Sequence, residues 1–244
     1  MTLDTSTTVR ELAVSQPGAT RIFEKMKIDY CCGGGRSLAD ACAVAGVKTE
    51  DVWQLLEEVS QSQSQGDETI DFQTASLTRV VKYILDKHHV FTKEEMARLE
   101  ALAEKVCSVH GQNHPELLKV KSLFQSLCAD LKPHMFKEER VLFPYIIRLE
   151  DAVNRKQMPM MPPFGTVQNP VRMMMFEHDT AGDLLRELRK VTSDYTTPQD
   201  ACISYKTLYQ ALEAFEQDLH QHIHLENNVL FPRAIEMEST AYSA

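Results

Sequence analysis

The stretch HMFKEERVLFP at residues 134–144 recurs as HIHLENNVLFP at residues 222–232, and these two segments decide the fold. Both follow the pattern His-x-x-x-Glu-x-x-x-Leu-Phe-Pro, and every element of the second copy lies 88 positions after the first. Residues four apart share one face of a helix, so the His and the Glu of each copy point in the same direction. Two such helices facing each other would direct two imidazoles and two carboxylates at one interior point.

The repeat extends further towards the N-terminus. His89 lies 45 positions before His134, and His178 lies 44 positions before His222. A long period that is present twice indicates a duplicated pair of helices rather than a solenoid. The two halves together offer six candidate metal ligands in a pseudo-twofold arrangement: His89, His134, Glu138, His178, His222 and Glu226.

Apolar residues spaced by three and four lead into these candidate ligands and predict amphipathic helices whose core face carries them. We therefore expect an all-α protein, in which a small helical N-terminal domain precedes a four-helix bundle. The expected divisions are residues 1–60 for the small domain, 61–69 for a polar linker, 70–237 for the bundle and 238–244 for a frayed tail.

The composition excludes several classes of function. The chain has 244 residues and a formal net charge of −9, which argues against binding to nucleic acid or to an anionic membrane. We find no apolar run of about 18 residues that would span a membrane, and no features of a signal peptide. The six cysteines do not form the framework of a small secreted domain, so we expect a cytoplasmic protein with reduced thiols.

The candidate ligands need partners, because burying an unpaired His or Glu costs on the order of several kcal/mol. Imidazoles together with bridging carboxylates suit a pair of iron ions. Since the set has few anionic ligands, an oxo or hydroxo bridge would offset the remaining positive charge, and an open position would accept a small diatomic molecule. Two alternatives stay open at this point, a buried network of His–Glu hydrogen bonds and a dinuclear zinc or manganese hydrolase.

The other histidines are assigned by their helical phase. The repeat spacing favours His89 over His88, which we expect to be a partly exposed helix residue. His110 lies on the same stripe, but in a continuous helix it would be about 31 Å from His89, too far to share a site. His220 and His224 each lie two positions from a candidate ligand and are expected on the solvated surface.

Adjacent cysteines, Cys31 and Cys32, precede three glycines. Neighbouring cysteines cannot easily form a disulfide with each other without strain. The glycine run could form a nest of N–H groups that lowers a thiol pKa, which would make a reactive pair that handles iron, sulfur or nitric oxide. The alternative is a tight turn with one buried cysteine.

Segments beyond the six candidates narrow the interpretation. The chain carries DYCCGG at residues 29–34 and EHD at residues 177–179, in addition to the repeated motif. Together these segments, which span nearly the whole chain, resemble the Repair of Iron Centers family, whose members contain a hemerythrin-like domain. The resemblance implies a bacterial di-iron protein, induced by nitrosative and oxidative stress, that helps to restore damaged iron–sulfur clusters.

The resemblance also implies roles for individual residues and partners. By position, the four histidines would be terminal ligands and the two glutamates the bridges. Glu177 and Asp130 would be acidic neighbours of the site on an iron or proton path, with Asp130 standing where the family pattern has Glu. The implied partners are iron–sulfur proteins as clients and nitric oxide or oxygen as a small ligand.

Several functional alternatives stay open. The physiological act is either iron donation or nitric oxide reduction, and only the second would make the chain an enzyme. A hemerythrin-like oxygen or redox sensor, with the N-terminal domain as its output, is the alternative function. A homodimer in which the small domain contacts the bundle of another subunit is one conceivable assembly.

Overall fold

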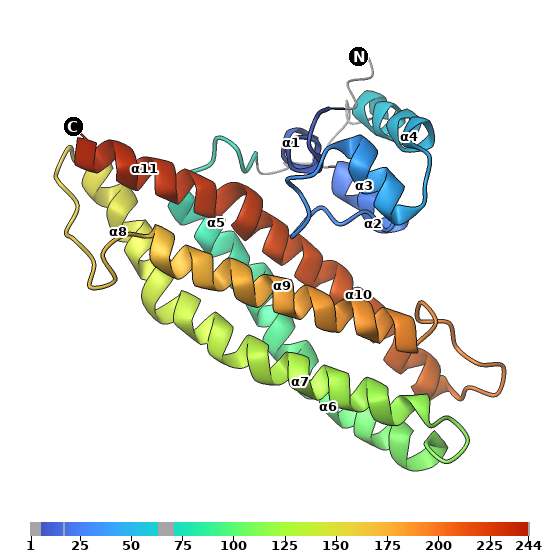
Figure 1. Ribbon diagram of the computed structural model, residues 1–244. Coiled ribbons are helices and arrows are strands. Elements are labelled where there is room, and N and C mark those ends of the chain that lie inside the picture. The colour runs from blue at the N-terminus through green and yellow to red at the C-terminus, as the bar shows by residue number, and fades with distance from the viewer. Residues whose placement is uncertain (1–5, 17, 63–70, 244) are drawn as a thin grey trace.

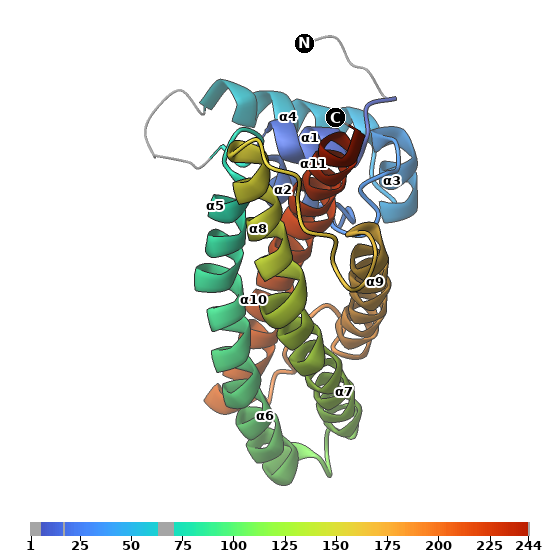
Figure 2. The ribbon, with the colours of Figure 1, turned by 90° about the vertical axis from the view of Figure 1, so that its left-hand side faces the viewer.

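The computed structural model describes residues 6–16, 18–62 and 71–243. Four long helical columns run up and down in an antiparallel bundle (Figures 1 and 2). In chain order they are α5 (Leu77–Tyr83) with η1 (Ile84–His89) and α6 (Val90–His110); α7 (Glu116–Lys137) with η2 (Glu138–Leu142) and α8 (Phe143–Asn154); α9 (Gln168–Val191); and α10 (Ile203–Leu225) with η3 (Glu226–Leu230) and α11 (Phe231–Ser243). The all-α class and the bundle are as predicted.

Three of the columns contain a wide π-helical turn at the level of the candidate ligands. The turn η1 ends at His89, and the turns η2 and η3 begin at Glu138 and Glu226. Pro144 and Pro232 follow, and a proline cannot donate a hydrogen bond to the carbonyl four residues earlier. A π turn absorbs this break without ending the column, and such turns are frequent at functional sites.

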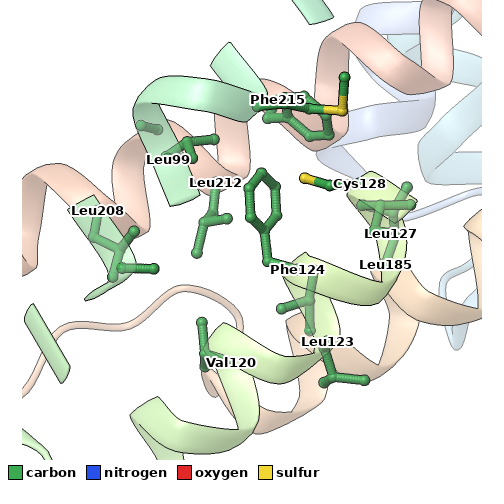
Figure 3. Close-up of a cluster of buried hydrophobic side chains, with 14 of the residues drawn as sticks. Leu99, Val120, Leu123, Phe124, Leu127, Cys128, Leu185, Leu208, Leu212 and Phe215 are labelled. Atoms are coloured by element: carbon green, nitrogen blue, oxygen red, sulfur yellow. The ribbon is translucent and has the colours of Figure 1, made fainter. Parts of the chain in front are cut away.

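The candidate ligands lie between two hydrophobic clusters that fill the bundle on either side of them. One cluster joins α6, α7, α9 and α10 and includes Leu127 and the edge-on ring pair of Phe124 and Phe215 (Figure 3). The other joins α5, α8, α11 and the first half of α9 and includes Phe143 and Phe231. The polar site therefore lies between two apolar clusters. Because these clusters pack on both sides of it, the candidate ligands meet at one level of the bundle.

The small domain consists of α1 (Val9–Ser15), α2 (Ala19–Lys25), α3 (Leu38–Ala45) and α4 (Thr49–Ser62), and it has a hydrophobic core of its own. It lies against the side of the bundle formed by α9 and α10 (Figure 1). Arg10 donates to Asn228 at 2.7 Å, and His220 lies 2.8 Å from Glu24. A Cβ at Gly34 would lie 2.9 Å from the carbonyl oxygen of Tyr30 and 3.2 Å from Asn228, so glycine allows this close approach.

Two predicted boundaries differ from the structure. Residues 61–62 of the expected linker belong to α4, and residues 63–69 lie outside the described part of the chain. The tail that we expected to be frayed from residue 238 continues α11 to Ser243, because buried Glu238 accepts hydrogen bonds from Tyr145, Thr166 and the backbone of Val167. Among the described residues, no helix combines the length and apolar character needed to cross a membrane.

Candidate metal centre

The structure brings all six candidate ligands together in the middle of the bundle, and each of them is buried. Their donor atoms form two groups of four, in which all atoms lie within 4.8 Å of one another. Each group has two histidines of its own, and both groups contain the same two glutamates. The first group is His89, His222, Glu138 and Glu226, and the second is His134, His178, Glu138 and Glu226.

The imidazoles face the carboxylates through their Nε2 atoms. His134 and His89 lie 3.3 and 3.5 Å from Oε2 of Glu138. His178 lies 3.1 Å from Oε2 of Glu226, and His222 lies 3.0 Å from Oε1 of the same side chain. Each carboxylate therefore reaches one histidine of each group, which is the geometry of two positions bridged by two carboxylates.

The opposite ring nitrogen, Nδ1, is occupied in three of the four histidines. It lies 2.8 Å from Glu139 in His89, 2.8 Å from Glu177 in His134 and 2.9 Å from Asn227 in His178. Acceptors at Nδ1 keep the proton on that atom and leave the Nε2 lone pair free to bind a metal. The amide of Asn227 is oriented in turn, because its Nδ2 donates to the carbonyl oxygen of Cys31 at 3.3 Å.

Buried polar atoms without partners show that these residues fit bound metal. Among the residues that the structure describes, Nε2 of His89, both carboxylate oxygens of Glu138 and Oε2 of Glu226 are buried without a hydrogen bond of acceptable geometry. The Nε2 atoms of His134 and His178 lie 3.0 Å apart, and each ring already has an acceptor at Nδ1. Two lone pairs at this distance repel each other unless a proton or a cation lies between them.

The electrostatics of the site favour ionised carboxylates. Burial raises the pKa of Glu138 and Glu226, but the neighbouring histidines outweigh this effect and hold both pKa values below the ordinary range. Burial lowers the pKa of His134, and the carboxylates of Glu138, Glu226 and Glu177 more than offset it and raise the pKa to about 9. His222 has no such carboxylate behind its ring, and burial lowers its pKa. The carboxylates are thus charged and ready to act as ligands.

Two of the residues behind the ligands were missed in the sequence, although the repeat contains the signal. Glu139 directly follows Glu138, Asn227 directly follows Glu226, and each supports the first histidine of its own half. They lie 88 positions apart, like the other elements of the repeat. An acceptor directly after each motif glutamate is therefore part of the duplicated unit.

His88 and His224 are buried, so the prediction of a partly exposed His88 and a surface His224 was wrong. The ring of His88 stacks on His222 with centroids 5.7 Å apart, and its Nδ1 lies 3.0 Å from Asp218. The π turn η1 adds a residue to the turn and allows both His88 and His89 to face inward. His224 accepts from Asn228 at 2.9 Å, and burial lowers its pKa to about 4.

The remaining acidic and histidine candidates occupy different places. Half-buried Glu177 contacts His134 and pairs with Lys137, so it lies directly behind a ligand. Asp130 is exposed on α7, two positions after buried Cys128. His110 ends the column of η1 and α6 and lies 3.1 Å from Cys202, far along the helix from His89.

The environment of Cys31 differs from the expected nest around a reactive thiol. The N–H groups of Cys32 and Gly33 point at the carboxylate of Asp29, at 3.0 and 2.9 Å, instead of at a sulfur atom. Neighbouring Cys32, burial and the charge of Asp29 all raise the pKa of Cys31 well above its ordinary value. The expectation of a lowered pKa is therefore wrong for Cys31, which is held as a neutral thiol.

The fold and the site define a four-helix bundle with a buried His/Glu cluster that could hold metal, and comparisons with known proteins place it in the hemerythrin class. Residues 80–234 match the hemerythrin HHE cation binding domain, and residues 5–60 match a domain of unknown function, DUF542. The chain is 35% identical over 225 residues to a probable iron-sulfur cluster repair protein of Haemophilus influenzae, with 92% of this chain and 95% of the relative covered.

Further relatives carry a similar description. The chain is 33% identical over 227 residues to the iron-sulfur cluster repair protein YtfE of Yersinia pseudotuberculosis and, with the same identity and length, to that of Yersinia pestis. In each case 93% of this chain and 96% of the relative are covered. The chain therefore belongs to the hemerythrin HHE family and, within it, to the family of these iron–sulfur cluster repair proteins, as the resemblance of the sequence predicted.

Proposed function

We propose that this protein restores iron–sulfur clusters damaged by nitrosative or oxidative stress, and that it does so by supplying iron from a buried pair of iron ions. The observation that carries the proposal is that both groups of donors share the same two glutamates. The chain matches relatives over nearly their whole length, and these relatives are described as iron–sulfur cluster repair proteins. This similarity supports the same function.

Each residue of the centre has a distinct task in this proposal. His89 and His222 would hold one iron ion, and His134 and His178 would hold the other. Glu138 and Glu226 would contribute a carboxylate to both ions. When bound, the pair supplies iron that can be released and a position at which a small diatomic molecule can bind. Because the set has only two carboxylates, it compensates less of the metal charge than a Glu-rich set would, which favours release.

Reduction of nitric oxide at the same centre is the second candidate, and it would make the protein an enzyme. A cavity of about 330 Å³ between the small domain and the bundle supports it, because His88 and His224 line this cavity. His88 also stacks on the candidate ligand His222, so the cavity gives a small molecule a place beside the centre. In an oxygen or redox sensor, the small ligand would reach the centre through the same cavity.

The proposal also covers partners and location. The clients would be iron–sulfur proteins, and the location would be the cytoplasm, where thiols such as Cys31 and Cys32 stay reduced. A homodimer remains a prediction, which light scattering of the purified chain tests. A role of Asp130 on an iron path also remains a prediction, and an iron-transfer assay on Asp130→Asn tests it.

Anaerobic iron transfer tests the function. The iron-loaded protein is mixed with an apo-ferredoxin and a sulfide source, and the charge-transfer absorption of the rebuilt cluster is recorded. We expect rebuilding with the wild type and with Glu236→Leu, a matched Glu→Leu change at an exposed position of α11, and none with Glu138→Leu. Rebuilding by an iron-free Glu138→Leu variant would refute the proposal. Absence of iron transfer, together with conversion of nitric oxide to nitrous oxide when the iron-loaded protein is given nitric oxide and a reductant, would favour the second candidate.

A further inference from the structure

The small domain carries a second cluster of metal-binding groups, formed by Asp29, Cys31 and Cys32. One donor atom from each side chain lies within 4.8 Å of the others. The cluster lies between α2 and α3 and contains none of the six donors of the bundle. Cys31 is buried, whereas half-buried Cys32 lines a pocket of about 130 Å³ together with Gly182 and Arg186.

The separation of the two sulfur atoms fits a shared metal ion. The Sγ atoms of Cys31 and Cys32 are 3.8 Å apart. In a tetrahedral site with metal–sulfur bonds of about 2.3 Å, two sulfur ligands are also about 3.8 Å apart. A disulfide would require them to approach to about 2.05 Å. One cation can therefore contact both sulfur atoms without a change in their separation.

The backbone holds the carboxylate of Asp29 beside the sulfur atoms. Its Oδ1 accepts from two N–H groups of the turn and lies 3.5 Å from Sγ of Cys31. A Cβ at Gly33 would lie 3.1 Å from Cγ of Asp29, so a larger residue at this position would crowd the carboxylate. Two sulfur atoms and one fixed carboxylate suit divalent cations such as Zn²⁺ and Fe²⁺. Thiolates bind these cations in preference to Mg²⁺ or Ca²⁺.

We propose that Asp29, Cys31 and Cys32 bind one thiophilic divalent cation, Fe²⁺ in the cell, at a mononuclear site that is separate from the centre in the bundle. Binding forms two metal–sulfur bonds and releases the two thiol protons to solvent, and no electron is transferred. Three protein ligands leave a fourth position open towards the pocket, as in sites where a ligand is exchanged. The proposal rests on the proposed function only for the identity of the cation.

The position of this site relates it to the bundle. Sγ of Cys32 lies 3.7 Å from the backbone carbonyl oxygen of His178, and a Cβ at Gly182 would lie 3.7 Å from the same sulfur atom. The side chain of Asn227 joins the carbonyl of Cys31 to Nδ1 of His178. A cation held by the cysteines would therefore lie against the helix that supplies one ligand of the buried centre, which suits a loading or unloading site.

Co²⁺ is the probe, because Co²⁺ bound by thiolates in a tetrahedral site absorbs strongly in the near ultraviolet through sulfur-to-metal charge transfer. The full chain, with its thiols reduced and the buried centre already filled, is titrated with Co²⁺ under anaerobic conditions. We expect one further Co²⁺ per chain, with a thiolate band that is lost in Cys31→Ser and in Cys32→Ser. Asp29→Asn should weaken binding, and Cys202→Ser, which changes an exposed cysteine, should leave the band unchanged.

The absence of a thiolate band in the wild type would overturn the proposal, and so would a band that survives in both Cys31→Ser and Cys32→Ser. Far-ultraviolet circular dichroism verifies that the serine variants are folded. The buried centre has no sulfur ligand, and the band is read as the difference from the spectrum before Co²⁺ is added, so it reports on the cysteines. If the proposed function failed, iron transfer would be missing while the Co²⁺ band remained, and the two failures are therefore distinguishable.

Discussion

The side-chain oxygen of Asn227 lies 2.9 Å from Nδ1 of His178 and accepts its proton. The amide nitrogen of Asn227 donates to the carbonyl oxygen of Cys31, so one side chain joins the small domain to a candidate ligand of the buried centre. A hydrogen bond of this kind fixes the tautomer and the orientation of a ligating ring. The docking of the small domain and the metal affinity of the bundle are therefore linked through one residue.

Replacing Asn227 by leucine should lower the metal affinity of the centre about 10-fold to 100-fold, because His178 loses the acceptor that orients it. A competition titration with a chelator measures the affinity. The control is Asn228→Leu, which removes two hydrogen bonds to the small domain, from Arg10 and to Tyr30, but no hydrogen bond to any of the six candidate ligands. Equal losses in both variants would mean that domain docking, and not ring orientation, sets the affinity.

Single substitutions of histidine and glutamate should have unequal effects on metal content. His89→Ala removes a donor from one group only and should leave one ion per chain, held by the group of His134 and His178. Glu138→Leu removes a donor from both groups and should leave none. Elemental analysis of both variants, with circular dichroism to verify folding, makes the comparison. Equal metal content in the two variants would contradict the shared-carboxylate geometry.

Glu238 should contribute strongly to stability although it lies near the end of the chain. Glu238→Leu leaves the hydroxyls of Tyr145 and Thr166 and the N–H of Val167 without their acceptor. We expect the free energy of unfolding to fall by roughly 2–4 kcal/mol, as buried donors lose their partner. Glu236→Leu, at an exposed position, should change it by less than about 0.5 kcal/mol. Urea unfolding measures the free energy of unfolding of both variants. Equal losses would contradict a stabilising role of Glu238 as a buried acceptor.

The cysteines should differ in the rate at which they are alkylated. Alkylation requires the thiolate, and burial raises the pKa of Cys128 to about 12, so the thiolate of Cys128 is rare at pH 8. Exposed Cys202 should therefore react with maleimide first, while Cys128 stays unmodified until the protein unfolds. Peptide mass spectrometry at timed intervals identifies the modified residue. Labelling of both at the same rate would show that this part of the bundle opens readily.

Much of the fold was predictable because the repeated motif and the spacing of apolar residues act through local geometry. His134 and Glu138 share a helical face in any α-helix, and the apolar residues that lead into them determine which face is buried. The residues that hydrogen-bond to the candidate ligands could be predicted from the sequence only in part. Glu139 and Asn227 occupy the same position in both copies, so the repeat itself could have indicated them.

Other features could not be predicted, because they depend on tertiary contacts. His88 faces inward because the turn before His89 is π-helical, and an α-helical phase assigns it to the side. Cys31 is a neutral thiol because the N–H groups of the turn point at Asp29, and the glycine run alone does not show which group they meet. The helix at the C-terminus persists because Glu238 is buried against a distant loop.

The most direct test of the central claim is the iron content per chain of the wild-type protein from iron-replete cells, together with its near-ultraviolet spectrum. Two buried groups that share Glu138 and Glu226 predict about two iron ions per chain, with charge-transfer absorption typical of an oxo-bridged pair. Zinc in place of iron would favour a dinuclear hydrolase. A folded wild-type chain without metal would contradict the account and leave a buried network of His–Glu hydrogen bonds as the explanation of the site.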